Sequence, residues 1–267
     1  MAANRALWDE WTEIHVGSDF YDVAGFKAGR ITLRDYEIAE VGEVAGKDLL
    51  HLQCHFGMDS LSWARLGARV TGADYSDNGI ARARELADEL GVPATFVNSN
   101  IYDLRDALEG AFDIVYTSRG VLGWLPDIEG WADVVSHYVS PGGFFYITEM
   151  HPFAAVFDDE GTDHLRVRYP YWHTDEPLAW PTQGSYADPS ATVETPTEFG
   201  WQHSLGEIIS ALAGRGLVIE FLHEFDFVDW AAMPCLQHHP EDGTWRLPPG
   251  HAGEIPLFFS LRAAKPT

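Results

Sequence analysis

Hydrophobic residues along the chain fall into short continuous runs, separated by stretches in which they recur at helical spacing. The runs at residues 49–52, 69–72, 94–98, 112–117 and 144–148 are mostly apolar, as strands buried on both faces of a parallel sheet are. Between the runs, apolar residues recur three and four positions apart, which is typical of one helical face. The pattern therefore predicts strands and helices in regular alternation, with a Pro-Gly-Gly turn before the last of these runs.

Polar residues mark where several of the predicted helices begin. Asp77 is placed to cap a helix whose apolar stripe continues to Leu90. Residues 131–138 carry a second apolar stripe. Ser204 and Glu207 have the spacing of a capping box at the start of a third helix. These signals predict helices that follow strands, as in a sheet with helical crossovers.

The alternation stops at His151 and resumes near Ser204. Residues 151–200 are rich in Pro, Asp, Thr and aromatic side chains and show no helical period, so we expect an insertion with short irregular strands. Two further strands are predicted at 217–221 and 255–261. The fold class is therefore α/β: a Rossmann-like, doubly wound, seven-stranded and mostly parallel sheet with an antiparallel C-terminal edge strand.

The same changes of pattern divide the chain into four parts. Residues 1–46 form a helical N-terminal segment, and residues 47–150 form the regular α/β core. Residues 151–200 are the insertion, and residues 201–267 return to the core sheet. We expect one large α/β domain built from these parts.

Composition and charge narrow the environment and the partners. The 267 residues carry a formal net charge of −24, which disfavours nucleic acid and anionic membranes as partners. No apolar run approaches the ~20 residues that span a bilayer, and the N-terminus has no apolar signal core, so we expect a cytoplasmic protein. The two cysteines, Cys54 and Cys235, fit a reducing compartment. Cys235 lies near several histidines, but their spacing matches no zinc signature, and we predict no metal site.

The segment from the first strand to Asp74 is typical of nucleoside-binding proteins. A strand, a turn that ends at Gly57, a helix and a second strand lead to an acid placed to bind ribose hydroxyls. A dinucleotide site needs a G-x-G-x-x-G turn, because pyrophosphate must approach the backbone closely. Gln53 and His55 would crowd a pyrophosphate here, so a cofactor without phosphate is favoured over NAD.

The order and spacing of the motifs resemble those of class I S-adenosylmethionine (SAM)-dependent methyltransferases of the small-molecule type, with a variant glycine motif. The resemblance covers roughly residues 30–150 by motif. The motifs correspond to residues 51–57, Asp74, Asn100 with Ile101, residues 112–127 and residues 139–144. In the family, the first motif has an acid and three glycines; here His51 replaces the acid, and Gln53 and His55 replace two glycines.

The resemblance implies that the protein transfers a methyl group from SAM to a small-molecule acceptor, at oxygen or nitrogen more than at carbon, and releases S-adenosylhomocysteine (SAH). It assigns cofactor binding to a set of residues at the carboxyl ends of the strands. These are Gln53, Cys54, His55, Gly57, Asp74, Tyr75, Asn100, Ile101 and Ser118. It also implies that residues 1–46 form a lid or cap, that residues 47–150 hold SAM, and that the insertion at 151–200 forms the substrate pocket.

The altered turn leaves open how the methionine end of SAM is held. The Gln53 side-chain oxygen is one option for the amine, and backbone carbonyls of a tilted turn are another. The altered turn also leaves open an alternative function, that of a non-catalytic or regulatory protein that binds SAM or SAH.

Three residues are candidates for the chemistry. His151 follows the fifth strand and is the first candidate for a general base, because its ordinary pKa suits neutral pH. Arg119 follows the fourth strand and is a candidate to orient a substrate anion, with a loop salt bridge as the alternative. Tyr21, in the N-terminal segment, is a candidate to reach cofactor or acceptor, with simple aromatic packing as the alternative.

Aromatic and histidine residues suggest where the acceptor binds. We assign His15, Trp172 and Trp201 to the substrate pocket, whose aromatic walls suit a ring or an amine that becomes quaternary. The expected partner is a small-molecule acceptor, and a homodimer is one option for the assembly. The acceptor, the pathway and any need for a base are not set by the sequence.

Overall fold

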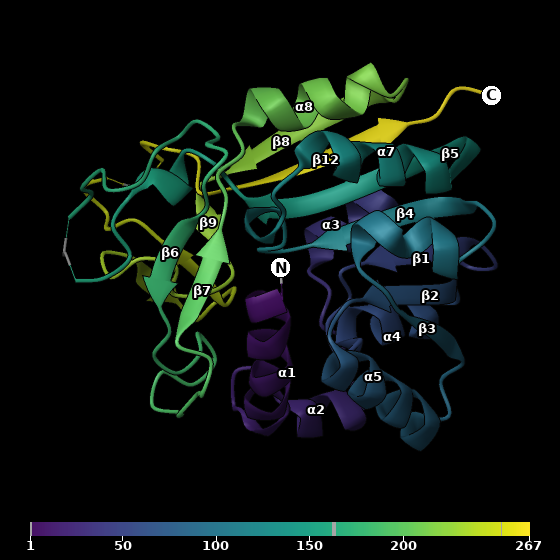
Figure 1. Cartoon of the computed structure of the whole chain (residues 1–267), viewed down its shortest axis with the longest axis horizontal. Helices are drawn as coiled ribbons and strands as arrows, with labels where there is room; N and C mark the ends of the chain where they lie inside the picture. The colour runs from purple at the N-terminus through teal and green to yellow at the C-terminus, as the bar shows by residue number, and fades with distance from the viewer. Residues whose placement is uncertain (1, 162–163, 252) are drawn as a thin grey trace.

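A seven-stranded sheet forms the centre of the protein in the computed structural model, which describes residues 2–161, 164–251 and 253–267 (Figure 1). The strand order is β3-β2-β1-β4-β5-β12-β8. Their bounds are β1 Asp48–Leu52, β2 Arg69–Asp74, β3 Ala94–Asn98, β4 Phe112–Ser118, β5 Val139–Met150, β8 Val218–Phe225 and β12 Phe258–Ala264. Strands β1 to β5 pair in parallel, and β12 pairs antiparallel with both β5 and β8. The predicted α/β class is confirmed; the reversed C-terminal strand lies one place inside the edge, and β8 forms the edge itself.

Alternating side chains of the central strands explain why their sequences are continuously apolar. Leu49 and Ile114 point to one face of the sheet, where they pack with residues of α3 (Asp35–Val41) and α4 (Met58–Arg65). Leu50 and Val115 point to the other face, where they pack with α7 (Ile128–Tyr138) and α8 (Leu205–Gly214). Because helices cover both faces of the sheet, neither face of these strands is exposed to solvent and both carry apolar side chains.

Helix starts follow the predicted capping logic with one correction. The capping box of Ser204 and Glu207 is present at the start of α8. Helix α5 (Asp77–Leu90), however, is capped by Ser76, whose hydroxyl accepts a hydrogen bond from Gly79 N at 2.9 Å. Asp77 is instead the first helical residue, because Ser76 already has the extended backbone that a cap requires.

Several strand boundaries differ from the predicted ones. The predicted Pro-Gly-Gly turn lies inside β5, where the pairing with β4 becomes irregular and Gly142 takes a φ of +80°. Strand β12 begins at Phe258, three residues after the predicted start, and β8 continues to Phe225 because it pairs with β12 along its length. Pairing partners, which apolar runs do not encode, set these ends.

The N-terminal segment and the insertion lie against each other beside the sheet. Helix α1 (Ala2–Gly17) contacts α5 on one side and β7 on the other (Figure 1). Hydrogen bonds from the Asn4 amide to Phe199 O (2.7 Å) and from the Trp11 indole to Gly184 O (2.9 Å) tie α1 to the insertion. The remaining elements are α2 Val23–Lys27, η1 Ile101–Asp103, α6 Leu104–Ala107, η2 Leu122–Trp124, η3 Ala154–Val156, β6 Leu178–Pro181, β7 Thr197–Gly200, β9 Phe227–Val228, β10 Gln237–His239 and β11 Thr244–Arg246. Of the helices in the described ranges, none is long and apolar enough to cross a membrane.

Candidate functional site

A cavity of about 700 Å³ opens where β1, β2 and β4 end, which is where ligands bind in open α/β sheets. Its walls come from the N-terminal segment, the turn after β1, the loops after β2, β3 and β4, and the loop between β9 and β11. The cavity brings together every residue that we assigned to the cofactor and two of the three catalytic candidates. These are Tyr21, Gln53, Cys54, His55, Gly57, Asp74, Tyr75, Asn100, Ile101, Ser118 and Arg119.

The turn after β1 has a glycine-type backbone without glycine at two positions. Gln53 and His55 have φ values of +58° and +52°, and Gly57 has +81°. A left-handed backbone costs a residue with a side chain about 1–2 kcal/mol. This chain therefore has a left-handed backbone at the positions where the methyltransferase motif has glycines. Gly57 itself is tightly enclosed, because a Cβ there would lie 2.9 Å from the Phe96 ring.

The acid after β2 is joined to this turn. Asp74 accepts hydrogen bonds from His55 N at 2.8 Å and from Ser76 N at 2.9 Å, one at each carboxylate oxygen. Burial raises the pKa of Asp74 above its ordinary value, while these backbone donors oppose the rise. Each oxygen keeps a free lone pair, so the carboxylate has the acceptors that a pair of ribose hydroxyls needs.

Gln53 presents an unpaired acceptor at the cavity wall. Its amide nitrogen donates to Val121 O at 3.3 Å, whereas its Oε1 is buried and has no partner among the described residues. A buried acceptor without a donor is costly unless a ligand satisfies it. An ammonium group has the complementary chemistry.

His51, which stands where the resembling motif has an acid, carries no charge. Its Nδ1 lies 2.8 Å from the Ser60 hydroxyl and its Nε2 lies 3.2 Å from the Ser118 hydroxyl. Burial lowers the pKa of His51 to about 4, so the ring is neutral at physiological pH. His51 therefore positions Ser118 through a hydrogen bond and supplies no negative charge.

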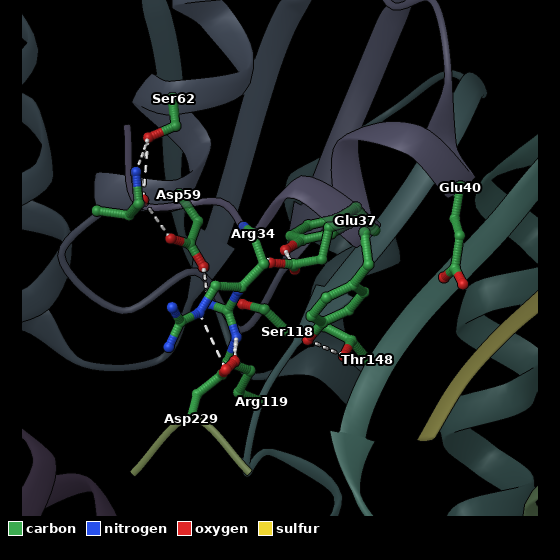
Figure 2. Close-up of polar contacts among 12 residues, drawn as sticks. Arg34, Glu37, Glu40, Asp59, Ser62, Ser118, Arg119, Thr148 and Asp229 are labelled. Atoms are coloured by element: carbon green, nitrogen blue, oxygen red, sulfur yellow. Dashed lines mark hydrogen bonds and ion pairs between the residues drawn. The ribbon is translucent and has the colours of Figure 1, made fainter. Parts of the chain in front are cut away.

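Arg119 is surrounded by three carboxylates, as Figure 2 shows. It forms ion pairs with Glu37, with Asp59 at 3.3 Å and with Asp229 at 2.8 Å. Asp229 also pairs with Arg34 at 2.9 Å. We call these five residues the Arg119 cluster. It joins α3, α4, the loop after β4 and the loop after β9, which are far apart in the sequence.

Burial and ion pairing act in opposite directions on the acids of the cluster. Burial raises the pKa of Glu37 to about 7, although the Arg119 charge opposes the rise. Burial also works against the Asp59 charge, yet Arg119 and hydrogen bonds from Thr32 and Ser118 hold its pKa below the ordinary value. The guanidinium of Arg119 thus forms its ion pairs with acids of the protein itself. The ion pairs favour the salt-bridge alternative for Arg119, and a role in orienting a substrate anion stays a prediction.

Tyr21 meets the insertion across the cavity. Its hydroxyl lies 2.5 Å from the hydroxyl of Tyr186, and both side chains line the cavity. Burial, reinforced by Tyr186, raises the pKa of Tyr21 well above 10. Tyr21 is therefore a hydrogen-bonding group at neutral pH and is unsuited to act as a base.

His15 lies behind the cavity wall, in a hydrogen-bonded chain. Its Nδ1 is 2.8 Å from His55 Nε2, and its Nε2 is 2.6 Å from the Ser185 hydroxyl. His15 is fully buried, and burial lowers its pKa to about 3. His15 is not itself in the cavity lining, but its ring packs against those of Tyr21 and Tyr186, which are, so its assignment to the substrate pocket stays a prediction.

Three other predicted residues lie outside the large cavity. His151 accepts a hydrogen bond from Phe153 N at 3.0 Å, and its Nε2 lies 3.0 Å from the Glu224 carboxylate on β8. The chain turns toward the sheet edge directly after β5, so His151 does not line the large cavity, and its role as the base stays a prediction. Trp172 is 69% exposed, and Trp201 lines a smaller neighbouring cavity instead.

The sequence analysis missed several residues that form the cavity. Asp59 and Asp229 line it, as do Trp8 and Trp124. The Trp8 and Trp124 rings meet edge to face at 5.3 Å. Asp59 lies two residues after Gly57, and that closeness to the turn was a usable signal. No local pattern marks Asp229, because only the folded C-terminal loop brings it to the site.

Comparison with known proteins agrees with this geometry. Residues 50–145 match the family model described as "Methyltransferase domain". A ubiquinone biosynthesis O-methyltransferase of Photorhabdus laumondii is 32% identical over 117 residues, which is 44% of this chain and 48% of that protein. The protein of the same name from Cronobacter sakazakii is 35% identical over 140 residues, covering 51% and 57%. The chain thus spans about half the length of the curated relatives that it matches.

Solved structures extend the likeness of the fold to most of the chain. An S-adenosylmethionine-dependent methyltransferase of Mesorhizobium loti superposes with a TM-score of 0.57 at 22% identity, covering 85% of this chain and 95% of that one. The glycopeptide N-methyltransferase MtfA in complex with SAM superposes with a TM-score of 0.54 at 17% identity, covering 87% and 86%.

Proposed function

We propose that this protein transfers a methyl group from SAM to a small-molecule acceptor, because residues 50–145 match the methyltransferase-domain model and the fold is that of solved SAM-dependent methyltransferases. The proposal rests mainly on the hydrogen bond that joins the turn after β1 to Asp74. The turn has the glycine-type backbone, and its His55 amide donates to the acid that would bind the ribose. The comparisons support SAM as the cofactor.

The residues present fit each part of SAM. Asp74 would offer two carboxylate oxygens to the ribose hydroxyls, and Asn100 with Ile101, which also line the cavity, would contact the adenine. Gln53 offers its unpaired Oε1 to the ammonium of the methionine part. This use of Gln53 replaces the acid that is absent at His51. When bound, SAM supplies an electrophilic methyl group on a sulfonium.

The contribution of the chain to the reaction is to orient the acceptor and to exclude water. We propose that the N-terminal segment 1–46 forms the lid and that the insertion 151–200 forms part of the pocket, with Tyr21 and Tyr186 meeting between them. The acids Asp59 and Asp229 are held in ion pairs, and His51 is neutral with both ring nitrogens in hydrogen bonds. A nucleophilic oxygen or nitrogen that needs little help from a base therefore suits the cavity.

A second candidate is a SAM- or SAH-binding protein without catalysis. The observation that favours it is that the large cavity lacks the predicted base, because His151 lies at the sheet edge. We further propose that the protein is cytoplasmic and acts on a small molecule and not on nucleic acid, in keeping with the net charge of −24. A homodimer is the assembly to test.

The experiment that separates the two candidates measures SAH release from SAM across a library of hydroxyl and amine acceptors. Turnover with any acceptor, lost in the Asp74→Ala variant, supports the methyltransferase. Tight binding of SAM without turnover across the whole library supports the non-catalytic candidate.

A further inference from the structure

A second cavity, of about 260 Å³, lies next to the large one and has a different lining. Gly120 and Trp124 belong to both linings, so the two spaces share a wall. Trp180 and Trp201 also line the smaller cavity, as do the acids Glu149, Asp159 and Glu198. The lining among the described residues contains no Lys or Arg. Three tryptophans and three acidic residues thus line a small space whose described lining residues include no Lys or Arg.

The hairpin of the insertion sets the position of the central pair. Trp180 on β6 lies directly opposite Glu198 on β7, so both side chains are on the same face of this two-stranded sheet. Gly200 lets the Trp180 ring approach closely, because a Cβ there would lie 2.9 Å from the ring. The Trp180 indole donates to the Tyr169 hydroxyl at 3.0 Å. These contacts fix the ring beside the carboxyl group.

The carboxyl groups of this cavity are not equally satisfied. Glu149 accepts backbone hydrogen bonds from Gly120, Val121 and Leu122 at 2.7 to 3.1 Å. Among the described residues, Asp159 accepts a hydrogen bond from the Tyr169 hydroxyl at 2.7 Å and forms an ion pair with Arg168 at 3.9 Å. Glu198 receives no hydrogen bond and no ion pair from any residue in the described ranges.

Burial, and to a smaller extent Asp159, raises the pKa of Glu198 to about 7. The raised pKa reflects the free-energy cost of burying a charged carboxylate, and a bound cation would offset that cost.

His203 adds a further acceptor to the same wall. Its Nε2 lies 2.7 Å from Leu125 O, and because a carbonyl only accepts, Nε2 carries the proton. The Nδ1 atom is then a lone pair, buried and without a partner, on a side chain that is 4% exposed. Burial lowers the pKa of His203, so the ring stays neutral. The polar groups that lack partners here are therefore acceptors.

We propose that this second cavity is a binding site for a small organic ammonium ion, held by Glu198 and enclosed by the indoles of Trp124, Trp180 and Trp201. Aromatic faces attract desolvated ammonium groups, and the carboxylate supplies the opposite charge. The volume suits a ligand smaller than drug-sized molecules, whose pockets begin near about 300 Å³. The acidic surface of the protein attracts such cations in general. The proposal concerns binding and does not depend on methyl transfer.

The test uses choline and its neutral carbon isostere, 3,3-dimethylbutan-1-ol, as probes in calorimetry and in tryptophan fluorescence titrations of the full chain. We expect choline to bind and the neutral alcohol to bind at least tenfold more weakly. Glu198→Gln and Trp180→Leu should each weaken choline binding about tenfold or more. Glu194→Gln, an exposed acid that precedes β7, is the matched control and should change nothing.

Three further readouts keep the proposal falsifiable. SAH binding should be unchanged in Glu198→Gln, which shows that the variant is folded and separates this proposal from the proposed function. Choline affinity should rise between pH 6 and 8 as Glu198 loses its proton; Arg168, 3.9 Å from Asp159, keeps its charge throughout this range. Equal binding of choline and the alcohol, unchanged affinity in Glu198→Gln, or competition by Mg²⁺ at stoichiometric concentration would each overturn it.

Discussion

The backbone amide of His55 donates a hydrogen bond to the carboxylate of Asp74 at 2.8 Å, across two different strand ends. The turn after β1 and the acid after β2 are therefore one structural unit. A shift of the backbone at His55 would move the carboxylate of Asp74, and loss of that carboxylate would leave the His55 amide without its acceptor. In this unit the acid is held in place before any nucleoside binds.

The first prediction concerns that acid. Asp74→Ala removes charge-assisted hydrogen bonds to the ribose and should weaken SAH binding by about 1.5–3 kcal/mol. Calorimetric titration with SAH measures the loss. The control is Asp88→Asn, an exposed acid on α5, which should bind SAH as the unaltered protein does. Unchanged affinity in Asp74→Ala would mean that the ribose binds elsewhere.

The second prediction separates the backbone of Gln53 from its side chain. Gln53→Gly and Gln53→Ala both remove the unpaired Oε1, so both should weaken SAH binding about tenfold. The glycine variant should nevertheless be more stable than the alanine variant by about 1–2 kcal/mol, because φ is +58° here. Denaturant unfolding compares the two. An alanine variant as stable as the glycine variant would show that the turn does not strain this residue.

The third prediction concerns the Arg119 cluster. Arg119→Met leaves Glu37, Asp59 and Asp229 buried without their cation and should lower the free energy of unfolding by about 3–5 kcal/mol. Arg82→Met, which breaks exposed ion pairs on α5, should cost less than about 1 kcal/mol. Chemical denaturation tests both variants. Equal losses would argue that the cluster is no more than a surface ion-pair network.

The fourth prediction is a pH dependence. The pKa of Glu37 is about 7 in the folded protein, above the ordinary value of 4.5, so the folded state binds its proton more tightly than the unfolded state. The contribution of Glu37 to stability is therefore greatest below pH 4.5 and declines as pH rises toward 7. As pH rises over this range, the unfolding free energy of the unaltered protein should therefore fall relative to that of the Glu37→Gln variant. A difference that is flat with pH would contradict the assignment.

Local sequence patterns predicted the sheet because its strands are short apolar runs and its helices have clear stripes. They also located residues that line the cavity, since Gln53 directly follows β1, Asp74 ends β2, and Asn100 lies two residues after β3. They did not predict that His151 lies outside the cavity lining, because its direction depends on its contact with Glu224 on β8. They could not find the Arg119 cluster, because Glu37 and Asp229 meet only through tertiary packing. Non-local pairing, and not composition, determines those parts of the site.

The central claim is that the large cavity binds a sulfur nucleoside and not a dinucleotide. The most direct test is calorimetric titration of the full chain with SAM, SAH and NAD under one buffer condition. The account predicts binding of SAM and SAH with one site per chain and no measurable heat with NAD. Binding of NAD, or no measurable binding of either sulfur nucleoside, would contradict it.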